Sequence, residues 1–405
     1  MKAGEFRLRK IRDPRGGEVI DEAIVLAFRA PHSYTGEDVV EFQTHGGAMS
    51  AARVLEAALA SGAEHAEAGE FTKRAFLNGR LDLSAAEAVM DLIGAESARA
   101  ARAAADQLGG ALGRKIGALL DSLLAVCADI EASLDFADDE ANSILAPARV
   151  PERLAETLAE IHALSATWRE GRLLREGALV VLSGAPNAGK STLFNALLGA
   201  PRSIVTDIPG TTRDSIEEPF SIDGIPIRLV DTAGIRDTDS AIERLGVERA
   251  EDLVSKADLN LRLIEGGASI PDCPPDTLII FTKSDLKGRG AERPADAPHL
   301  SVSAVTGDGI TELKAAISKR LLASTAVSSS ASGVVAVSAR HHALLDEAAA
   351  AIRTASDAYG AASADSAVIT AQSLRAAAES LARITGRSYS EALLDAIFSR
   401  FCVGK

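Results

Sequence analysis

The segment at residues 184–191, G-A-P-N-A-G-K-S, constrains the fold of this chain most, because it matches the phosphate-binding pattern G-x-x-x-x-G-K-S in full. The apolar run 178–183 precedes it, and the helix-forming run 192–198 follows it. In such a strand–loop–helix setting, backbone N–H groups surround phosphate oxygens, Lys190 neutralises the β- and γ-phosphates, and Ser191 can ligate Mg²⁺. The alternative is a plain glycine-rich turn, which the flanking elements disfavour. The segment therefore predicts a nucleotide-binding α/β domain.

A second motif, D-T-A-G at residues 231–234, ends the strand-like run 225–230. Asp231 can hold Mg²⁺ through water, and the Gly234 amide can contact a γ-phosphate and respond to its loss. The motif is weak evidence alone and strong evidence behind a phosphate-binding loop.

A third motif, T-K-S-D at residues 282–285, follows the strand-like run 277–281. The Asp285 carboxylate can accept hydrogen bonds from the N1–H and the exocyclic amine of guanine, which adenine does not supply together. Lys283 can pack its stem over the base, and Ser303 with Ala304 matches a loop that completes such a pocket. Thr282 stands where Asn is commoner in this motif, which predicts a weaker brace to the phosphate-binding loop. The sequence favours GTP over ATP.

The polar loop T-D-I-P-G-T-T-R-D at residues 206–214 lies between the first two motifs and has the position of a switch I loop. Thr212 is then the second Mg²⁺ ligand, and the alternative is an ordinary surface loop. The expected nucleotide-binding residues are Asn187, Ala188, Gly189, Lys190, Ser191, Thr192, Thr206, Asp207, Ile208, Pro209, Gly210, Thr211, Thr212, Asp231, Thr232, Ala233, Gly234, Thr282, Lys283, Ser284, Asp285, Ser303, Ala304 and Val305.

The rest of the chain divides by pattern into further domains. Residues 1–78 mix the β-like runs 23–28 and 39–43 with turns, which predicts a small α+β domain. Residues 79–175 are helical and end in an amphipathic helix at 151–175. Apolar residues at steps of three and four predict one buried helix face, formed by Ile116, Leu120, Leu123, Cys127, Ile130 and Leu134.

Strands alternate with helices over residues 176–323, which indicates βαβ units and a parallel sheet. After a small polar linker at 324–333, residues 324–405 are again Ala-rich and helical. We expect a multi-domain protein of the α/β plus all-α class. Its P-loop domain is inserted between two parts of a helical domain, behind the α+β module.

The formal net charge of −14 repels polyphosphate over most of the surface, so contact with nucleic acid must be local or supplied by a partner. The one long basic run is R-L-R-K-I-R-D-P-R, at residues 7–15. Three widely spaced cysteines indicate neither a zinc site nor a disulfide framework, and no apolar stretch suits a signal peptide or a membrane span. We expect a cytoplasmic protein without membrane contact.

The four motifs together resemble the Era/Der/MnmE group of translation-factor-related GTPases. Three segments outside the P-loop domain, at 34–47, 69–83 and 401–405, are similar to the MnmE (TrmE) family in that group, the last through its C-x-G-K ending. The resemblance implies a tRNA modification GTPase that forms a homodimer. It also implies a heterotetramer with the flavin-dependent partner MnmG (GidA), which adds a carboxymethylaminomethyl group at carbon 5 of the wobble uridine. tRNA is then expected to dock through the complex.

The resemblance also assigns roles to residues. It implies a catalytic part for Lys190 and makes Glu243 the residue that orients the attacking water, for which the alternative is a solvated helix charge. It implies Mg²⁺ ligation by Ser191 and Thr212. It further implies K⁺-dependent pairing of the GTP-binding domains, with K⁺ held by Asn187, Thr206, Ile208 and Thr211.

For the N-terminal domain, the resemblance implies a 5-formyl-tetrahydrofolate-type one-carbon donor bound by Glu41, Arg80 and Lys405. Family members begin with a Gly-rich segment near G-R-G-G-x-G-x-x-R-x-S-G, so the first segment of this domain is expected to be missing. Folate binding and dimerisation depend on that segment. Cys402 can supply a thiol, although the sequence favours a buried cysteine without chemistry.

Two alternatives stay open. A regulatory Era- or Der-like GTPase of ribosome assembly should carry a basic RNA-binding module or a second GTP-binding domain. A folate-binding module with a degenerate GTP-binding domain should lack some of Lys190, Ser191, Asp231 and Glu243, all of which are present.

Overall fold

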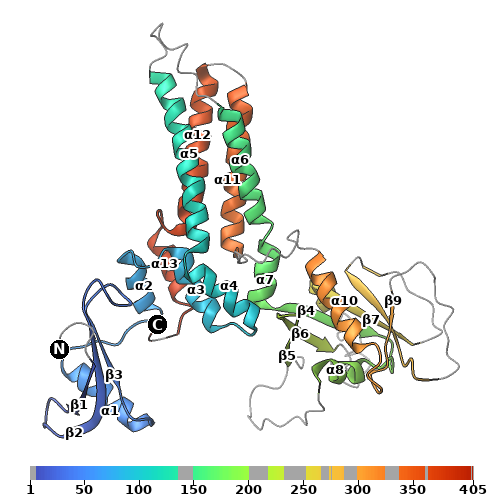
Figure 1. The fold of residues 1–405 in the computed structure, drawn as a ribbon, viewed down its shortest axis with the longest axis horizontal. Coiled ribbons are helices and arrows are strands. Elements are labelled where there is room, and N and C mark those ends of the chain that lie inside the picture. The colour runs from blue at the N-terminus through green and yellow to red at the C-terminus, as the bar shows by residue number, and fades with distance from the viewer. Residues whose placement is uncertain are drawn as a thin grey trace, which may run out of the picture. The chain divides into compact units, whose positions relative to one another are not determined.

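The computed structural model describes residues 6–135, 149–199, 218–231, 252–265, 273–274, 276–286, 299–323, 337–360, 364–402 and 404. The chain forms two compact units, whose elements Figure 1 labels. The first unit consists of residues 1–90, 105–161 and 343–405, and the second of residues 91–104 and 162–342.

The first unit contains a small antiparallel sheet. Its strands β1 (Phe6–Arg12), β2 (Val19–Phe28) and β3 (Val39–Gln43) lie in the order β1-β2-β3. Helix α1 (Ala48–Ala60) packs on β2, whose buried residues alternate with exposed or half-buried ones, as one covered sheet face requires. The strands expected at 23–28 and 39–43 are confirmed. Strand β1 was not predicted.

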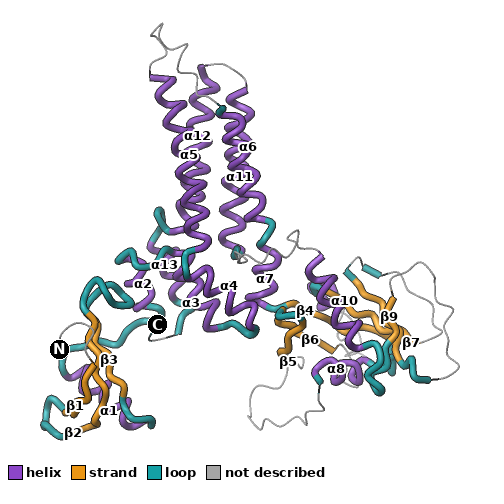
Figure 2. The backbone as a smooth tube through the Cα atoms, in the orientation of Figure 1, coloured by secondary structure: helices purple, strands orange, loops and turns teal. Residues whose placement is uncertain are grey.

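Helices make up the rest of the first unit. Phe76, Phe398 and Phe401 belong to an apolar cluster that joins α2 (Glu70–Leu77), α3 (Leu83–Ile93) and α13 (Glu391–Phe398). The helix α5 (Ala111–Asp135) packs along α12 (Ala364–Thr385), as Figure 2 shows. Helices α6 (Val150–Ser165) and α11 (Ala339–Gly360) also lie mostly in this unit, whereas α7 (Trp168–Glu176) and most of α4 (Ala98–Leu108) belong to the second unit.

The buried face predicted for the long helix is confirmed by Ile116, Leu120, Leu123, Cys127 and Ile130, all of which are buried in α5. Burial and the neighbouring Glu131 carboxylate raise the pKa of the Cys127 thiol to about 11. The thiol therefore stays protonated and packs as a small apolar group. The side chain of Leu134 lies outside the described residues.

The single helix expected at 151–175 was wrong. The structure has two helices, α6 and α7, separated by a turn at Ala166 and Thr167. The Thr167 hydroxyl donates to the Leu164 carbonyl at 2.7 Å. Such a side-chain hydrogen bond competes with the helix ladder, so a helical pattern in sequence can run through a break in the chain.

The second unit is built on a six-stranded sheet in the order β5-β6-β4-β7-β8-β9. Strands β4 (Ala178–Gly184), β6 (Ile225–Asp231), β7 (Leu259–Glu265), β8 (Thr277–Thr282) and β9 (His299–Ser301) are parallel. Strand β5 (Glu218–Ile222) pairs antiparallel with β6 at one edge. The strands expected at 178–183, 225–230 and 277–281 are confirmed, and β5, β7 and β9 were not predicted.

Helices α8 (Lys190–Leu198) and α10 (Ile310–Ala323) contact this sheet. The sequence pattern explains their placement, because Leu193, Leu197, Leu313 and Ile317 recur at helical spacing and are all buried in the core of the unit. That core fixes the loop before α8 against the ends of the strands.

The division into domains at residues 78, 175 and 323 stays a prediction, as does the linker at 324–333, which lies outside the described residues. Residues 91–104 belong to the compact unit that contains the six-stranded sheet. Among the described helices, none has the length and apolar character needed to cross a membrane.

Candidate nucleotide-binding site

The predicted nucleotide-binding motifs meet at one edge of the six-stranded sheet. In the parallel register Leu182 of β4 pairs with Asp231 of β6, and Glu265 of β7 pairs with Thr282 of β8. The carboxyl ends of the strands therefore lie in line. Strand β4 lies between β6 and β7, so the connections on its two sides run in opposite directions across the sheet, and in such sheets ligands bind at this switch point.

The phosphate-binding loop runs from the end of β4 to the start of α8, and its backbone explains its glycines. A Cβ on Gly184 would lie 2.5 Å from the Leu263 carbonyl oxygen, so only glycine fits beside β7 there. Asn187 and Gly189 have positive φ values of 62° and 89°. These positive φ values turn the chain between β4 and the first turn of α8, as a phosphate-binding loop of this pattern requires.

Lys190 is the first residue of α8, and 7% of its surface is exposed. Its ammonium group donates to the carbonyl oxygens of Gly184 and Ala185 at 3.0 and 2.9 Å. The charge is therefore held inside the curve of the loop, next to the site of a bound phosphate. The predicted role of Lys190 as a phosphate ligand fits this placement.

Ser191, a predicted Mg²⁺ ligand, lies beside Asp231, which was predicted to hold the ion through water. The Ser191 hydroxyl donates to the Asp231 carboxylate at 2.8 Å. A hydroxyl and a carboxylate at this separation form a hard oxygen donor set of the kind that Mg²⁺ takes beside nucleotide phosphates. These residues fit the ion.

The base-binding residues come from the ends of β8 and β9. The Ser303 hydroxyl is buried and donates to the Asp285 carboxylate at 2.7 Å. Asp285 itself is exposed. The hydrogen bond uses one lone pair of one oxygen, which leaves the outer part of the carboxylate to accept from a base. Ala304 and Val305 follow Ser303 at the same end of the sheet, and Val305 is 79% exposed.

The brace between the base-binding motif and the phosphate-binding loop is present. The buried Thr282 hydroxyl donates to the Ala188 carbonyl oxygen at 2.7 Å. Threonine thus supplies one donor where the commoner asparagine has an amide group with two. The next residue, Lys283, has a φ of 61° and forms an ion pair of 3.2 Å with Glu265.

Sequence reasoning missed Glu265 and the buried pair of Ser183 and Asn260. The Ser183 hydroxyl donates to the Asn260 side-chain oxygen at 2.7 Å, linking β4 to β7 directly below the loop. Both Asn260 and Glu265 lie on β7, which was not recognised as a strand. The signal available was the apolar alternation of L-N-L-R-L-I-E at residues 259–265.

Several predicted site residues lie outside the described part of the chain, so their placement stays a prediction. They are Thr206, Asp207, Ile208, Pro209, Gly210, Thr211, Thr212, Thr232, Ala233, Gly234, Glu243 and Lys405. The residues brought together come from the phosphate-binding loop, from the start of the second motif and from the base-binding segments, namely Asn187–Thr192, Asp231, Thr282–Asp285 and Ser303–Val305.

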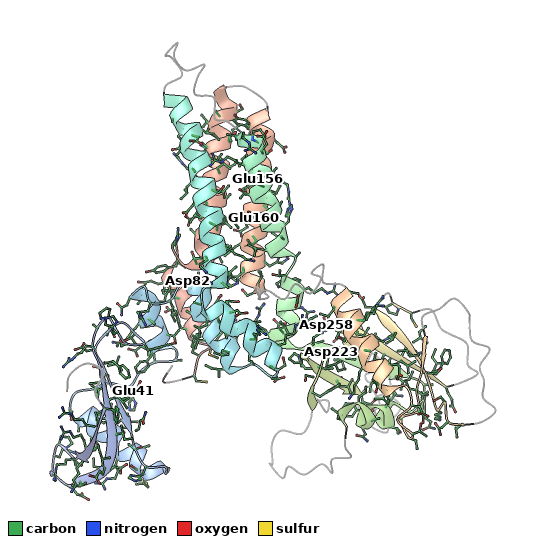
Figure 3. The ribbon with its side chains drawn as sticks, in the orientation of Figure 1. Glu41, Asp82, Glu156, Glu160, Asp223 and Asp258 are labelled. Carbon is green, nitrogen blue, oxygen red and sulfur yellow. The ribbon has the colours of Figure 1, made fainter. Side chains whose placement is uncertain are left out.

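The candidates for folate binding lie in the first unit. Glu41 is an exposed residue of β3, labelled in Figure 3, and Arg80 is exposed after α2. Within the described residues neither side chain has a hydrogen-bond or ion-pair partner. Gly36 lies beside Arg80, because a Cβ on Gly36 would meet the Arg80 Cγ at 3.2 Å.

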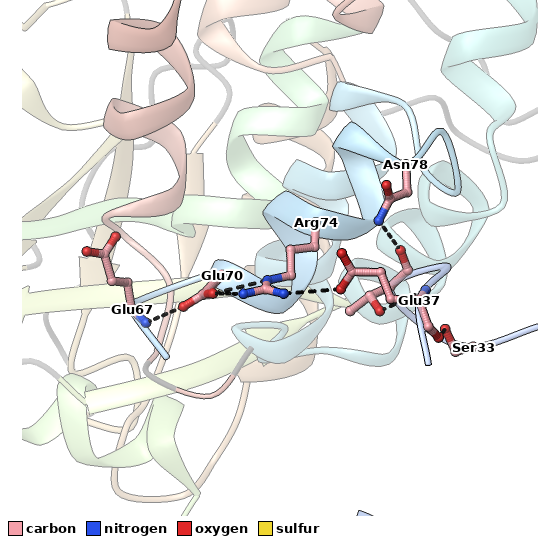
Figure 4. Close-up of polar contacts among 7 residues, drawn as sticks. Ser33, Glu37, Glu67, Glu70, Arg74 and Asn78 are labelled. Atoms are coloured by element: carbon pink, nitrogen blue, oxygen red, sulfur yellow. Dashed lines mark hydrogen bonds and ion pairs between the residues drawn. The ribbon is translucent and has the colours of Figure 1, made fainter. Parts of the chain in front are cut away.

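A polar network fixes the loop before β3 to α2, as Figure 4 shows. Arg74 pairs with Glu70 and with Glu37, and the Asn78 amide donates to the Thr35 carbonyl at 2.8 Å. The Arg74 guanidinium lowers the pKa of the Glu70 carboxyl below its ordinary value of 4.5. The network holds the backbone of α2 and the turn that leads to Arg80. It does not by itself show a ligand.

The expectation that Cys402 is buried was wrong, because the residue is exposed. Its carbonyl oxygen accepts from the Gly69 amide at 3.4 Å, so the backbone docks while the side chain faces outward. Neighbouring Phe401 fills the apolar cluster instead. The burial of a single cysteine near a chain end depends on tertiary contacts that the sequence pattern does not carry.

The chain is similar in sequence to known proteins over nearly its whole length. A family model described as the MnmE helical domain matches residues 83–402, and one described as the GTP-binding protein TrmE N-terminus matches residues 2–80. The tRNA modification GTPase MnmE of Thermus thermophilus is 44% identical over 415 residues, covering 100% of this chain and 90% of that protein. The tRNA modification GTPase MnmE of Moorella thermoacetica is 42% identical over 420 residues, covering 99% and 89%.

Among solved structures, the G domain of the T. maritima FeoB iron transporter is 28% identical. The match covers 35% of this chain and 98% of that chain, with a TM-score of 0.28.

Proposed function

The chain belongs to the MnmE family, and we propose that it is a GTPase whose hydrolysis cycle drives modification of the wobble uridine of tRNA. The observation that supports this most is the convergence of a phosphate-binding loop, a Mg²⁺ donor pair and a guanine-accepting carboxylate at one sheet edge. The similarity to tRNA modification GTPases over the whole chain supplies the link to tRNA.

In this proposal the chain's own groups hold GTP at three points. The loop amides and the Lys190 ammonium bind the β- and γ-phosphates, and Asp285 accepts from the guanine edge. Ser191 and Asp231 hold Mg²⁺, with Thr212 as a further ligand. The ion, when bound, neutralises charge that develops on the phosphate oxygens.

Two roles depend on residues beyond the described part of the chain. Glu243 orients the attacking water, and Asn187 holds K⁺ together with Thr206, Ile208 and Thr211. Asn187 lies on the exposed outer turn of the phosphate-binding loop, which supports a second contact made outside the loop. A cation there offsets transition-state charge as an arginine finger does.

The K⁺ role is tested by the GTP hydrolysis rate in KCl and in NaCl at equal ionic strength. Asn187→Gly removes the amide while tolerating the positive φ, so it should lose the K⁺ stimulation without a folding defect. Equal rates in the two salts for the wild type would reject the K⁺ site.

Glu243→Ala should lower kcat more than about twofold, and a smaller change would reject its role.

The finer proposal is that the modification adds a carboxymethylaminomethyl group at carbon 5, together with the flavin-dependent partner MnmG. A folate-type one-carbon unit would bind at Glu41, Arg80 and Lys405. The exposure of the first two side chains supports a ligand-accessible position. Titration with 5-formyl-tetrahydrofolate tests this, and binding that is unaffected by Arg80→Ala would reject the site.

The proposed homodimer is supported by an apolar face on the three-stranded sheet. Phe6, Leu8 and Ile24 are 72%, 62% and 39% exposed, and Leu8 pairs with Ile24 in the register. These side chains alternate with the buried residues under α1, so they share the opposite face. Leu8→Asp should shift the sedimentation of the protein toward the monomer, and an unchanged dimer would place the contact elsewhere.

The tRNA role is tested in a bacterial strain that lacks its own protein of this family. Expression of the wild-type chain should restore the modified wobble nucleoside, as measured by mass spectrometry of digested tRNA. Lys190→Ala should not restore it, whereas Lys319→Ala on the exposed side of α10 should. Restoration by Lys190→Ala would contradict a GTP-driven reaction.

A further inference from the structure

The end of β7 lies between the two parts of the nucleotide site and carries a carboxylate, Glu265, to which the proposed function gives no role. In the sheet, β7 pairs with β4, which leads into the phosphate-binding loop, and with β8, which leads into the base-binding motif. Leu263 pairs with Gly184, and Glu265 pairs with Thr282. Glu265 therefore lies at a strand end that adjoins both parts of the site.

Glu265 forms an ion pair with Lys283, the second residue of the T-K-S-D motif. The Lys283 ammonium group donates to a carboxylate oxygen of Glu265 at 3.2 Å. The two side chains are 33% and 34% exposed, and a pair with that much exposure adds little to the stability of a fold. Its main consequence is geometric, because it ties the end of a long, flexible side chain to a strand of the sheet.

The backbone of Lys283 is fixed as well. The residue has a φ of 61°, in the left-handed region. The Thr282 hydroxyl before it donates to the Ala188 carbonyl oxygen. The Ser284 amide after it donates to the Val302 carbonyl oxygen at 3.3 Å. Because the backbone is held at one end and the ammonium group at the other, the aliphatic stem between them has few conformations left.

The charge of Glu265 by itself opposes the binding of a nucleotide. A carboxylate near the phosphates that acted only through its charge would repel them and weaken binding. A carboxylate that holds the Lys283 stem against the base would strengthen binding, since the lysine then loses less freedom when the base enters. The two effects have opposite signs, so the direction of the change on removing the carboxylate separates them.

We propose that Glu265 is a positioning residue for the base, which holds the Lys283 stem where the face of the guanine ring packs. The inference rests on the proposed function, in which Asp285 accepts hydrogen bonds from the guanine edge. Lys283, fixed by Glu265, then covers the face of the same ring. Because the stem contacts neither the γ-phosphate nor the exocyclic amine, its effect is the same for GTP, GDP and inosine triphosphate.

The test measures the dissociation constant of a fluorescent GTP analogue for the full chain at fixed ionic strength. Glu265→Ala removes the ion pair, whereas Glu265→Gln keeps a side-chain oxygen that accepts from the ammonium group. Glu312→Ala removes an exposed carboxylate from the first turn of α10 and is the matched control for the loss of charge. Thermal melting of each variant checks that the fold is retained.

Glu265→Ala should raise the GTP dissociation constant about fivefold, and Glu265→Gln should raise it about twofold. The kcat at saturating GTP should stay within about twofold of the wild type, so that the loss appears in KM. GDP and inosine triphosphate should lose affinity by the same factor as GTP, and Glu312→Ala should bind as the wild type does. Unchanged or tighter GTP binding by Glu265→Ala would overturn the proposal.

A double-variant cycle tests whether Glu265 acts through Lys283. Lys283→Met keeps an unbranched apolar stem but removes the ammonium group, so the stem is no longer tied to β7. In this background Glu265→Ala should change the GTP dissociation constant by less than about twofold. An equal fivefold loss in both backgrounds would show that Glu265 acts independently of the lysine and would overturn the proposal. If Glu265→Ala lowers the melting temperature, the cycle is run with Glu265→Gln, whose loss should also disappear in the Lys283→Met background.

The outcomes separate this inference from the proposed function. Wild-type protein that binds GTP, together with Glu265→Ala that binds it equally well, would reject the role of Glu265 alone. Wild-type protein that binds no GTP would reject both.

Discussion

The two sheets of this protein differ in how they bury their residues and therefore in what they can position. In the six-stranded parallel sheet, β4 and β7 are buried almost along their whole length, and polar side chains concentrate at the strand ends. In the three-stranded antiparallel sheet, only Ala23, Val25 and Ala27 of β2 are buried. A parallel sheet covered by helices thus gathers its chemistry at one edge, whereas the small sheet presents whole faces and edges to its surroundings.

The two sheets also differ in the kind of binding site that they can form. At the parallel edge, functional groups from distant segments contact one another, as in the pairs Ser191–Asp231 and Ser303–Asp285. In the first unit, Glu41 of the small sheet and Arg80 after α2 have no such partners within the described residues. The first arrangement suits a compact ligand with several polar groups, whereas the exposed apolar face of Phe6, Leu8 and Ile24 on the small sheet suits a partner that binds over a surface.

The largest effect is expected from Asp285→Asn, which tests whether the edge of the parallel sheet binds guanine through this carboxylate. The variant loses the negative charge and one acceptor oxygen, so it no longer forms the two charge-assisted hydrogen bonds to guanine. The binding free energy of GTP should then weaken by about 3–4 kcal/mol in total. We expect the GTP dissociation constant to rise about 100-fold or more, measured by titration with a fluorescent GTP analogue. The control is Asp308→Asn, an exposed carboxylate of the following loop. A similar affinity in both variants would mean that the base is not read by Asp285.

A smaller effect is expected from Thr282→Val, which keeps the side-chain shape but removes the donor to the buried Ala188 carbonyl. Leaving that carbonyl without this donor costs about 1–2 kcal/mol, so GTP affinity should fall about five- to tenfold. Thr282→Ser retains the hydroxyl and should stay near the wild type. Equal behaviour of the Val and Ser variants would show that the brace contributes nothing to the site.

The smallest effect is expected from the Glu70–Arg74 ion pair of α2, which belongs to the network that fixes the loop before β3. The Glu70 pKa is lowered by Arg74, so their interaction stabilises the fold fully above the ordinary pKa of 4.5 and is lost as the pH falls through the lowered value. Because the pair is partly exposed, Glu70→Gln should lower the melting temperature by only about 1–2 °C at about pH 7 and by less below about pH 4. The exposed Glu64→Gln is the control. A Glu70→Gln effect that grows as the pH falls would have the wrong sign.

The sequence could predict which residues gather at the edge of the parallel sheet, because they follow motifs whose spacing is fixed by a strand, a loop and a helix, while their roles stay predictions. Lys190, Ser191, Asp231 and Asp285 all lie where those motifs place them. What it did not predict depends on tertiary contacts. Strand β7 contains the buried Asn260, whose side-chain oxygen accepts from Ser183 of β4, and the sequence alone does not show which strand supplies that partner.

The small sheet and the chain end were harder to predict for the same reason. Strand β1 alternates apolar and basic residues, which is a local signal for a strand, but all of them are exposed or half-buried and the segment was recognised only as a basic run. The exposure of Cys402 follows from Phe401 taking the place in the apolar cluster. At the break between α6 and α7, the Thr167 hydroxyl donates to the Leu164 carbonyl, a contact that the helical pattern of the sequence does not reveal.

The most direct test of the central claim is the rate of phosphate release from GTP by the purified chain, wild type against Lys190→Ala, with ATP as the comparison substrate. The account predicts GTP hydrolysis, at least about tenfold slower turnover of ATP, and a loss of about 100-fold or more in kcat/KM for the variant. A variant as active as the wild type, or a preference for ATP, would contradict it.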